Sequence, residues 1–469
     1  MKDSVDMQRK QQTSYEGSSA KNRMESEGMH RVPSISLASE KDASGATSDD
    51  LMERILSRDN LFSALKRVER NKGSHGVDGM KVDELRPFLK QNWLSTKESI
   101  LTGSYKPNAV RRVEIPKPDG GVRLLGIPTV LDRLIQQAIA QVLNTIFDPH
   151  FSHSSYGFRP RRKAHHAIIA ARRYMNQGYR YVVDMDLEKF FDRVNHDVLM
   201  HRISKRVEDK RVLKLIRLYL QSGIMINGIS VRSEKGTPQG GPLSPLLSNI
   251  LLDDFDKELE RRGHKFCRYA DDCNIYLKSE RAGQRVMKSI TIFLEKELKL
   301  KVNKEKSAVD EPTRRKFLGF SFYTAKGKYE IRIHPKSIQR VKDKIRTITS
   351  RKWSISIEER VRRLNQVTSG WVNYFSIANA KSIMQQLDGW IRRRLRMCIW
   401  KQWKKPRTKV LRLVSLGIPK QKAYEWGNTR KGYWRIASSP ILHRSLGTKY
   451  FDTISYQSLM ARYLKMQAT

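Results

Sequence analysis

Short strands are predicted in the first two thirds of the chain, where apolar residues alternate with polar ones or run in short blocks. The stretches 181–187 and 266–276 are both of this kind, and the second contains two adjacent aspartates at its middle. That interruption predicts a strand, a turn and a second strand, with the acids at the tip. Val113 and Ile115 precede a turn sequence rich in proline and glycine at 118–121, which predicts a hairpin between two further strands.

Helices are predicted where apolar residues recur at spacings of three and four. Asp50 precedes such a run from Leu51 to Phe62 and is placed to cap it, and a second run covers about 129–147. Helical spacing also follows the strand at 181–187, and it dominates the last third of the chain. One buried helical seam is predicted there, formed by Met384, Leu387, Ile391, Leu395 and Cys398. Strands followed by a helical region indicate an α+β fold.

The composition excludes several classes of protein. The chain has 469 residues, 39% of them hydrophobic, and no stretch of 18 apolar residues, so a membrane-spanning helix is not expected. Its three cysteines, Cys267, Cys273 and Cys398, form no Cys-x-x-Cys pair, which argues against a disulfide framework and a four-cysteine zinc module. The N-terminus lacks the apolar segment of a secretory signal. We therefore expect a reduced, cytoplasmic protein without a membrane partner.

Positive charge is the most unusual feature of the composition. Lysine and arginine number 91 against 48 aspartates and glutamates, a net charge of +43. Residues 1–50 carry a net charge of −2, whereas residues 331–469 carry +25. A polyanion would offset the self-repulsion of such a chain, so we infer a nucleic-acid partner. Residues 1–49, which are polar and without periodicity, are predicted to be a disordered leader.

Two acidic sites are candidates for catalysis. Asp184 and Asp186 lie two residues apart on a predicted strand and therefore share one face of it, while Asp271 and Asp272 lie at the predicted turn. A pair of aspartates at a turn is commonly only solvated, but carboxylates within an apolar strand are unusual in a core. Two hard divalent cations held between neighbouring strands would explain both sites. Such a pair activates a 3′ hydroxyl and stabilises a leaving pyrophosphate, which indicates nucleotidyl transfer.

The sequence around these aspartates resembles the reverse transcriptases encoded by group II introns. Residues 269–272 are similar to the active-site box of that family, and residues 186–192 are similar to its companion box. Further boxes occur in the family's order at 115–123, 155–160, 236–245, 300–307 and 317–320. The resemblance covers about residues 50–440. It implies a right-hand polymerase, with fingers and an antiparallel-sheet palm at 50–333, then a helical thumb and maturase region at 334–440 and a C-terminal tail at 441–469.

The resemblance also implies a metal site. Asp186, Asp271 and Asp272, with the backbone carbonyl of Leu187, would hold two Mg²⁺ ions. In the family, an aromatic or bulky residue follows the metal-binding aspartate five positions later, and Phe191 stands in that relation to Asp186. Asp184 is therefore expected to be a supporting residue.

Further roles follow from the same resemblance. Phe191 would be the steric gate that crowds a ribose 2′-OH and favours dNTPs. Residues 317–320 would support the primer end, and by composition they read as a core strand. The other residues expected to contact the incoming nucleotide or the template are Lys117, Arg123, Arg159 and Gln239.

The basic last third of the chain is predicted to bind RNA. Its cations lie mostly off the buried seam and interleave with Trp390, Trp400 and Trp403, which either stack on unpaired bases or pack the helical core. The candidate RNA-binding residues are Arg392, Arg393, Arg394, Arg396, Lys401 and Lys404. No cysteine follows Cys398, so the resemblance is to the compact branch of the family that lacks a C-terminal endonuclease module.

The predicted function is RNA-directed DNA synthesis from dNTPs, together with binding of a group II intron RNA to assist its splicing and retromobility. The expected partners are this RNA, an RNA template, a DNA primer, target DNA and dNTPs. Two alternatives remain: a non-catalytic RNA-binding splicing factor, against which the three retained aspartates argue, and a reverse transcriptase recruited to defence. An RNA-templated RNA polymerase is disfavoured by Phe191.

Overall fold

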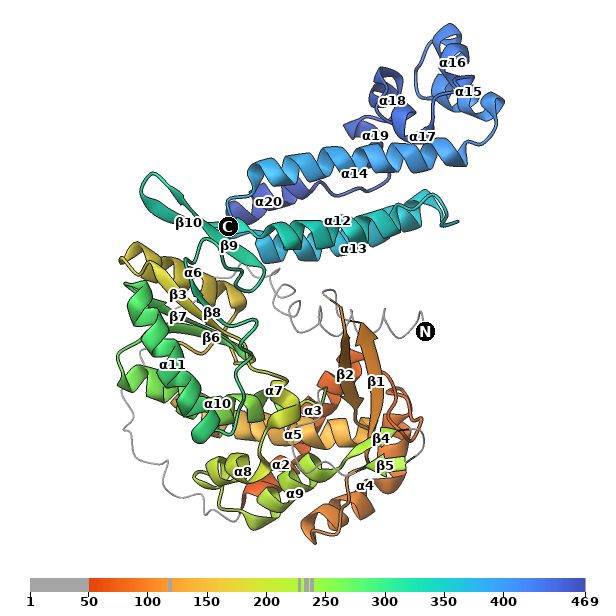
Figure 1. The fold of residues 1–469 in the computed structure, drawn as a ribbon. Coiled ribbons are helices and arrows are strands. Elements are labelled where there is room, and N and C mark those ends of the chain that lie inside the picture. Colours follow the sequence, from red (N-terminus) through yellow and green to blue (C-terminus); the bar gives the residue numbers. More distant parts are fainter. Residues whose placement is uncertain (1–49, 117–119, 227–228, 232–235, 237–239, 469) are drawn as a thin grey trace, which may run out of the picture. The chain divides into compact units, whose positions relative to one another are not determined.

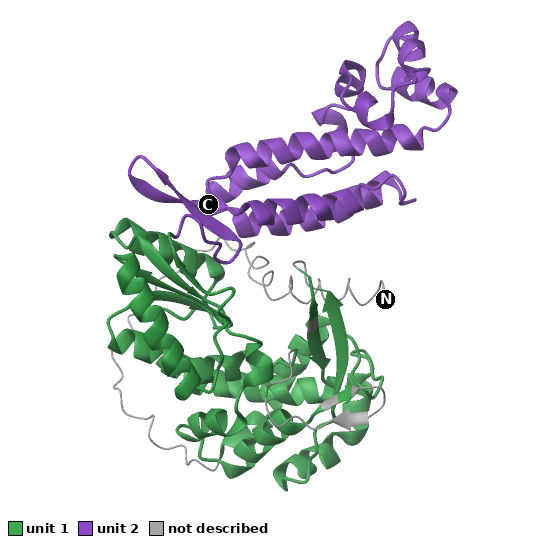
Figure 2. Cartoon of the chain, viewed as in Figure 1, with its two compact units in different colours: residues 1–311 green, residues 312–469 purple. Residues whose placement is uncertain are grey.

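The computed structural model describes residues 50–116, 120–226, 229–231, 236 and 240–468, and these divide into two compact units (Figure 2). Unit 1 runs to Glu311, and unit 2 begins at Pro312. The division falls earlier than the boundary at 333 that the sequence suggested. The reason is that residues 312–333 pack with the C-terminal helices: the Tyr374 hydroxyl donates to the carbonyl of Leu318 at 2.8 Å, and the Asn379 amide donates to that of Ile331 at 2.9 Å. The predicted leader lies outside the described residues.

Unit 1 consists of helices and two sheets (Figure 1). Apart from the helix at residues 164–176, the helices form one core through their apolar faces together with the second sheet. The helices are α2 Leu51–Ile55, α3 Arg58–Asn71, α4 Leu85–Leu101, α5 Val130–Phe147, α6 Ala164–Asn176, α7 Phe190–Arg193, α8 His196–Ser204, α9 Lys210–Gln221, α10 Ser244–Arg261 and α11 Glu280–Lys296, with the 3-10 helix η2 Asp148–His150.

The first predicted helix differs from its prediction. The run from Leu51 to Phe62 forms two helices, because Ser57 is extended (ψ 147°) and begins α3. Asp50 makes no capping hydrogen bond through its side chain. A distant carboxylate takes that role, since Asp209 accepts from the amide of Met52 at 3.0 Å.

The first sheet of unit 1 contains the hairpin predicted around residues 118–121. Its strand order is β2-β1-β4-β5, and Ile115 faces Arg123 across the antiparallel β1–β2 pair. The strands are β1 Val110–Pro116, β2 Val122–Ile127, β4 Ile224–Ile226 and β5 Ile229–Val231.

The second sheet is antiparallel and has the order β6-β7-β3-β8. One face, which includes Val183 and Ile275, lies in the core with the helices. The other face carries Asp184, and at one end α6 covers it through contact of the Tyr174 and Tyr276 rings at 5.7 Å. The strands are β3 Tyr181–Met185, β6 Lys265–Tyr269, β7 Asp272–Leu277 and β8 Ala308–Asp310. This is the antiparallel palm sheet that the sequence predicted.

Unit 2 is a hairpin followed by helices, which confirms the helical last third. Its strands are β9 Phe320–Ala325 and β10 Lys328–Ile333. Its helices are α12 Pro335–Ile348, α13 Ile357–Phe375, α14 Lys381–Gln402, α15 Pro406–Ser415, α16 Lys420–Gly427, α17 Tyr433–Ile436, α18 Pro440–Ser445, α19 Thr448–Thr453 and α20 Leu459–Gln467. None of the helices in the described ranges is long and apolar enough to cross a membrane.

Two segments of unit 2 differ from their predictions. Residues 317–320 form a tight turn and not a core strand, because Leu318 and Gly319 have φ angles of 50° and 86°. The segment expected to be a tail, 441–469, contains most of α18 and the helices α19 and α20. Asp388 of α14 is 2% exposed and accepts from the Tyr456 hydroxyl at 2.8 Å and the Leu459 amide at 2.9 Å, which anchors this segment to the unit.

Candidate functional site

The strand register brings the two acidic sites together. Met185 faces Cys273 across the β3–β7 pair, so the next position along each strand places Asp186 opposite Asp272. Asp272 in turn closes the β6–β7 hairpin opposite Tyr269, and Asp271 lies in the turn. Residues opposite one another in a sheet share a face, so Tyr269, Asp272 and Asp186 lie on the face that also carries Asp184. The structure thus joins the strand and the turn that the sequence singled out separately.

The backbone of Asp186 is fixed by the segment that contains residues 300–307. Its amide donates to the Ser307 hydroxyl at 3.0 Å, and its carbonyl accepts from the Asn303 amide at 2.8 Å. Successive carbonyls alternate in direction along an extended chain, so that of Leu187 points toward the β7 side. The Lys306 ammonium lies 3.9 Å from the Asp186 carboxylate. These contacts give the 300–307 box a physical role that its sequence alone did not reveal.

Asp184 lies within β3 and is hydrogen-bonded to the neighbouring strand. With its amide nitrogen turned toward β3, Asn274 donates to Asp184 Oδ1 at 2.9 Å. The two residues face each other in the register. The arrangement favours Asp186 over Asp184 as the metal ligand, because Asp186 lies two residues closer to the hairpin tip.

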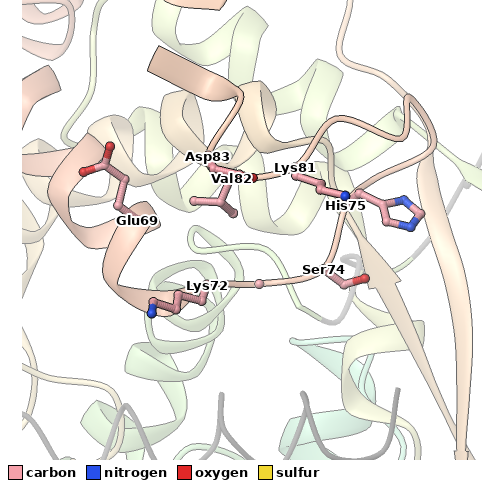
Figure 3. Close-up of a pocket in the computed structure, with 8 residues that line it drawn as sticks. Glu69, Lys72, Ser74, His75, Lys81, Val82 and Asp83 are labelled. Atoms are coloured by element: carbon pink, nitrogen blue, oxygen red, sulfur yellow. The ribbon is translucent and has the colours of Figure 1, made fainter. Parts of the chain in front are cut away.

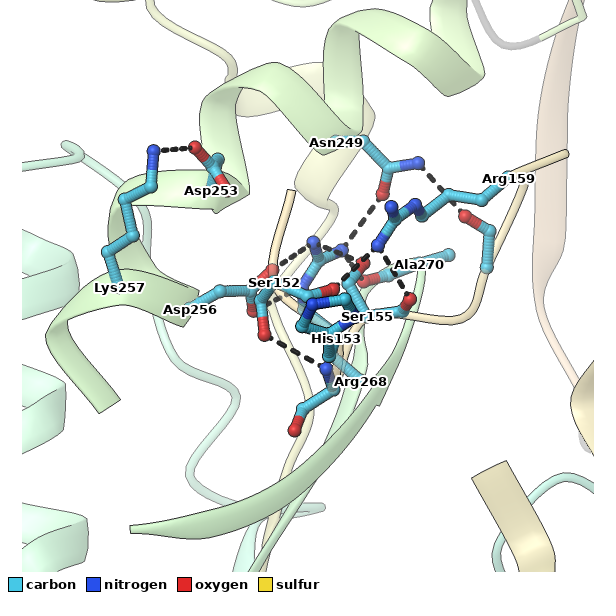
Figure 4. A network of polar contacts seen from close by, with 12 residues as sticks. Ser152, His153, Ser155, Arg159, Asn249, Asp253, Asp256, Lys257, Arg268 and Ala270 are labelled. Carbon is cyan, nitrogen blue, oxygen red and sulfur yellow. Dashed lines mark hydrogen bonds and ion pairs between the residues drawn. The ribbon is translucent and has the colours of Figure 1, made fainter. Parts of the chain in front are cut away.

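A buried arginine supports the hairpin tip from the opposite face (Figure 4). Arg268 is 0% exposed and forms a bidentate ion pair with Asp256 of α10, at 2.7 and 2.5 Å. Its remaining donors bind the Ala270 carbonyl at 3.0 Å, the Asn249 side chain at 3.0 Å and the Ser155 hydroxyl at 2.8 Å. One side chain therefore ties the turn to α10 and to the 155–160 box.

The 155–160 box touches the turn directly. A Cβ added to Gly157 would lie 2.3 Å from the amide nitrogen of Ala270, so only glycine fits at this approach. Ala270 itself has a φ of 58°, in the left-handed region that non-glycine residues seldom adopt. The close contact fixes the strained turn from which Asp271 and Asp272 extend.

Arg159 is placed differently from the prediction that it contacts nucleotide or template. Its side chain is buried, and its guanidinium donates to the Asp148 side chain at 2.7 Å and to the Ser152 carbonyl at 2.6 Å. It also lies over the ring of Phe151 at 5.4 Å. These bonds use the donors that a substrate would need, so we now assign Arg159 to the support of its loop.

Phe191 lies at the turn after β3, where the gate was predicted. It is half-buried in α7, and its ring meets that of Phe190 edge-on at 5.1 Å. Gly236, the first residue of the 236–245 box, approaches so closely that an added Cβ would lie 2.9 Å from the Phe191 carbonyl. The Gly236 amide also donates to the carbonyl of Val194 at 2.8 Å. The box therefore holds the backbone that carries the predicted gate.

Three other predicted nucleotide-binding residues cannot be placed by their side chains. Lys117 and Gln239 lie outside the described residues. Arg123 lies on β2 opposite Ile115, and its side chain is likewise outside the description.

The buried seam of α14 is confirmed, and it separates the predicted RNA-binding residues into two groups. Arg396 is 5% exposed and donates to the Leu446 carbonyl at 3.0 Å, and burial followed by the charge of Arg392 lowers its pKa to about 10. It is therefore a structural arginine and is removed from the RNA-binding set. The others are half-buried or exposed, namely Arg392, Arg393, Arg394, Lys401 and Lys404.

Some aromatic rings of this region lie against arginines. Trp400 is 1% exposed and packs in the core, as the alternative interpretation held, whereas Trp390 and Trp403 are half-buried. The Arg394 guanidinium lies 5.2 Å from the Trp390 ring, and that of Arg393 lies 3.9 Å from the Trp434 ring. Together with hydrogen bonds from Arg393 to the Trp434 carbonyl and from Arg394 to the Thr349 hydroxyl, these contacts orient the planar cations.

Unit 1 also contains a pocket of about 500 Å³ at the end of α3 (Figure 3). Glu69, Lys72, His75, Lys81 and Asp83 contribute polar groups to its lining. Among the residues that the structure describes, no predicted catalytic or nucleotide-binding residue lines it. It gives no reason to move the candidate site away from the hairpin tip.

Comparison with protein families identifies two regions. The family described as reverse transcriptase (RNA-dependent DNA polymerase) matches residues 115–322, and the group II intron maturase-specific domain matches residues 338–414. A reverse transcriptase domain followed by a maturase domain is thus confirmed.

Three individual proteins are similar to the chain. Protein YkfC of Escherichia coli (strain K12) is 32% identical over 299 residues, which cover 55% of this chain and 78% of YkfC. The group II intron-encoded protein LtrA of Lactococcus lactis subsp. cremoris is 35% identical over 219 residues, which cover 46% of this chain and 36% of LtrA. A solved chain of the partial Cas6-RT-Cas1–Cas2 complex is 26% identical with a TM-score of 0.33, covering 53% of this chain and 43% of that one, and a score this low supports no argument.

The order of the two domains matches the order of the sequence boxes, and the match to YkfC spans most of that relative. The chain belongs to the family of reverse transcriptases and maturases encoded by group II introns.

Proposed function

We propose that this chain extends a DNA primer on an RNA template, and that Asp186, Asp271 and Asp272 hold two Mg²⁺ ions for this reaction. Reverse transcriptase domains use divalent metal ions. The observation that supports the site is the register of β3, β7 and β6, which brings the three carboxylates to one end of one sheet.

The donor set suits a hard divalent cation. Three carboxylates and the Leu187 carbonyl supply only oxygen ligands, which Mg²⁺ prefers. Within the described residues, no three acidic, histidine or cysteine side chains form a group that could hold a metal ion as they stand. Neighbouring carboxylates repel each other, and cations between them would remove that repulsion.

The bound ions would make the primer 3′ hydroxyl more acidic and neutralise the charge of the leaving pyrophosphate. The chain itself fixes the carboxylates. Ser307 and Asn303 hold the backbone of Asp186, while Arg268 and Gly157 hold the turn. Ligands held in place before the reaction lower its barrier, because little reorganisation remains for the transition state.

We expect Phe191→Ala to admit rNTPs more readily. Truncating the ring opens space where a ribose 2′-OH would otherwise be crowded, so discrimination against rNTPs should fall by about tenfold or more. Phe191→Tyr keeps the bulk and is the matched control. The measurement is kcat/KM for single dNTP and rNTP additions, and an unchanged ratio in Phe191→Ala would remove the gate from the account.

Unit 2 is proposed to bind the group II intron RNA through the basic residues that remain outside its core. Residues 331–469 carry +25, and their arginines are oriented by aromatic rings, which suits contacts to phosphates. Assistance to splicing and retromobility, with target DNA as a further partner, belongs to the same proposal.

Lys404→Ala tests one such phosphate contact. Lys404 is exposed two residues beyond the end of α14, so its loss should weaken RNA binding and reduce the slope of log K against log salt by about 0.7 to 0.9. Lys90 is an exposed residue of α4 in unit 1. The Lys90→Ala variant is the control and should leave the slope unchanged. An unchanged slope in Lys404→Ala would exclude this residue from the RNA surface.

Primer extension tests the polymerase directly. A labelled DNA primer annealed to an RNA template should be extended with four dNTPs and Mg²⁺, and EDTA should abolish the product. No extension, combined with tight and salt-sensitive RNA binding, would favour the non-catalytic splicing factor.

A further inference from the structure

An exposed aromatic side chain beside the hairpin tip has no role in the account so far. Phe158 is 45% exposed, although burying such a ring would stabilise the folded chain. Its φ of 56° lies in the left-handed region, where a bulky residue is disfavoured. Neither the exposed ring nor the left-handed backbone stabilises the fold. A binding partner outside the chain would explain both features.

The residues on both sides of Phe158 are firmly held. Gly157 lies against the Ala270 backbone, and its carbonyl accepts from Asn249 at 2.9 Å. Arg159 is anchored to Asp148 at 2.7 Å. The ring is therefore presented to solvent from a fixed backbone and not from a mobile loop end.

The position of the ring is next to the candidate catalytic residues. The centroid of Phe158 lies 6.2 Å from that of Tyr269, with the ring planes at 45°. Tyr269 pairs with Asp272 across the hairpin, and the register of β3 and β7 places Asp186 on the other side of Asp272. The two rings thus form an aromatic surface at the edge of the acidic face.

Cations follow the exposed ring in the same loop. Arg161 and Lys163 are both exposed. Exposed aromatic rings interleaved with cations suit a single nucleic-acid strand, because the rings stack on bases while the cations neutralise phosphates. In a duplex the faces of the bases are already stacked, whereas an unpaired base offers a free face.

We propose that Phe158, together with Tyr269, stacks on the unpaired template base next to the primer end, and that Arg161 and Lys163 contact the adjoining phosphates. This inference rests on the proposed polymerase function and names the part of the substrate that this face binds. Phe158 is then a nucleic-acid contact that positions the template for the next addition.

The test uses a primer annealed to an RNA template that carries 2-aminopurine at its first unpaired position. Binding is followed by fluorescence in EDTA without dNTPs. Stacking on an aromatic ring changes the emission of this base, so wild type should give a signal that Phe158→Leu largely loses. The Kd should rise about fivefold or more in Phe158→Leu, as expected for one lost stacking contact. Phe158→Tyr should behave as wild type.

Two further variants separate contact from structure. Phe62 is also 45% exposed but lies on α3, and Phe62→Leu should change neither the Kd nor the emission. Phe158→Gly removes the backbone strain, so its unfolding midpoint should not fall, yet its binding should weaken as in Phe158→Leu.

Unchanged binding and emission in both Phe158→Leu and Phe158→Gly would overturn the proposal. An emission change that appears only when the probe is placed at the primer terminus would overturn its assignment to the template. Because the measurement needs neither metal nor synthesis, a wild type that gives the signal but does not extend the primer would contradict the polymerase proposal and not this one.

Discussion

Asp271→Asn is expected to reduce RNA-templated DNA synthesis by about a thousandfold or more while leaving RNA affinity within about twofold of wild type. The amide keeps the shape of the side chain but removes the charge that would hold a divalent cation. A metal ion in such a site contributes several kcal/mol to the barrier, and each 1.4 kcal/mol is a factor of ten in rate. RNA affinity should persist because the net charge of +25 in residues 331–469 is unchanged.

The measurement pairs single-turnover primer extension with filter binding of the same RNA. Asp197→Asn is the matched control, since it makes the same chemical change at an exposed carboxylate of α8, whose ion pair with Arg217 lies at the surface. Extension at the wild-type rate in Asp271→Asn would show that this carboxylate is no ligand. Loss of synthesis together with RNA binding would show that its role is structural.

Arg268→Met should destabilise unit 1 by about 3–5 kcal/mol. Arg268 and Asp256 are both 0% exposed, and removal of one partner leaves a buried carboxylate without its counter-charge. Burial raises the pKa of Asp256, and the pairing with Arg268 opposes that shift. Without Arg268 the folded chain should favour a protonated Asp256, so the destabilisation should be larger at pH 8 than at pH 5.

The double variant Arg268→Met/Asp256→Leu provides the control. It removes both charges and fills the space with apolar atoms, so it should recover much of the lost stability. Hydrogen exchange of residues 265–277 reports on the hairpin itself, and urea unfolding reports on the unit. A single variant as stable as wild type, or a double variant no better than the single one, would contradict the role given to this ion pair.

Sequence patterns located the catalytic strands well, because alternation and turn chemistry are local properties. Residues 266–276 form the predicted strand, turn and strand with the two aspartates at the tip, whereas the strand predicted at 181–187 ends two residues earlier, at Met185. What the sequence did not supply is the register between β3 and β7, since residues separated by many positions are paired by packing. The pairing of Met185 with Cys273 is the fact that joins the two acidic sites.

Buried arginines were the main class of residue that the sequence misassigned or missed. Arg159 and Arg396 were predicted to contact nucleic acid, and Arg268 was assigned no role, yet all three are buried and hydrogen-bonded within the protein. A charged side chain is expected at the surface unless a buried hydrogen-bond or ion-pair partner is known. The partners of these arginines are distant in the sequence. For Arg268 a signal did exist, because it lies within a predicted strand whose other residues are apolar or aromatic.

The C-terminal segment shows the same limit. Tyr456 and Leu459 bind Asp388, to which no role was assigned from the sequence. Only the three-dimensional packing of α14 shows that Asp388 is buried and that residues 456–460 complete its hydrogen bonds. The local sequence pattern therefore predicted helices in unit 2 but not which segments pack against one another.

The central claim is that Asp186 and the β6–β7 tip form one metal site, and cleavage by a substituted ion tests it most directly. Fe²⁺ bound in place of Mg²⁺ generates short-lived radicals, with ascorbate and peroxide, that cut the chain beside the ion. We predict cuts at 184–188 and at 269–273 in the complex with template, primer and dNTP, reduced by excess Mg²⁺ and lost together in Asp271→Asn. Cuts at one of these segments without the other, or cuts at both that persist in Asp271→Asn, would contradict a shared site.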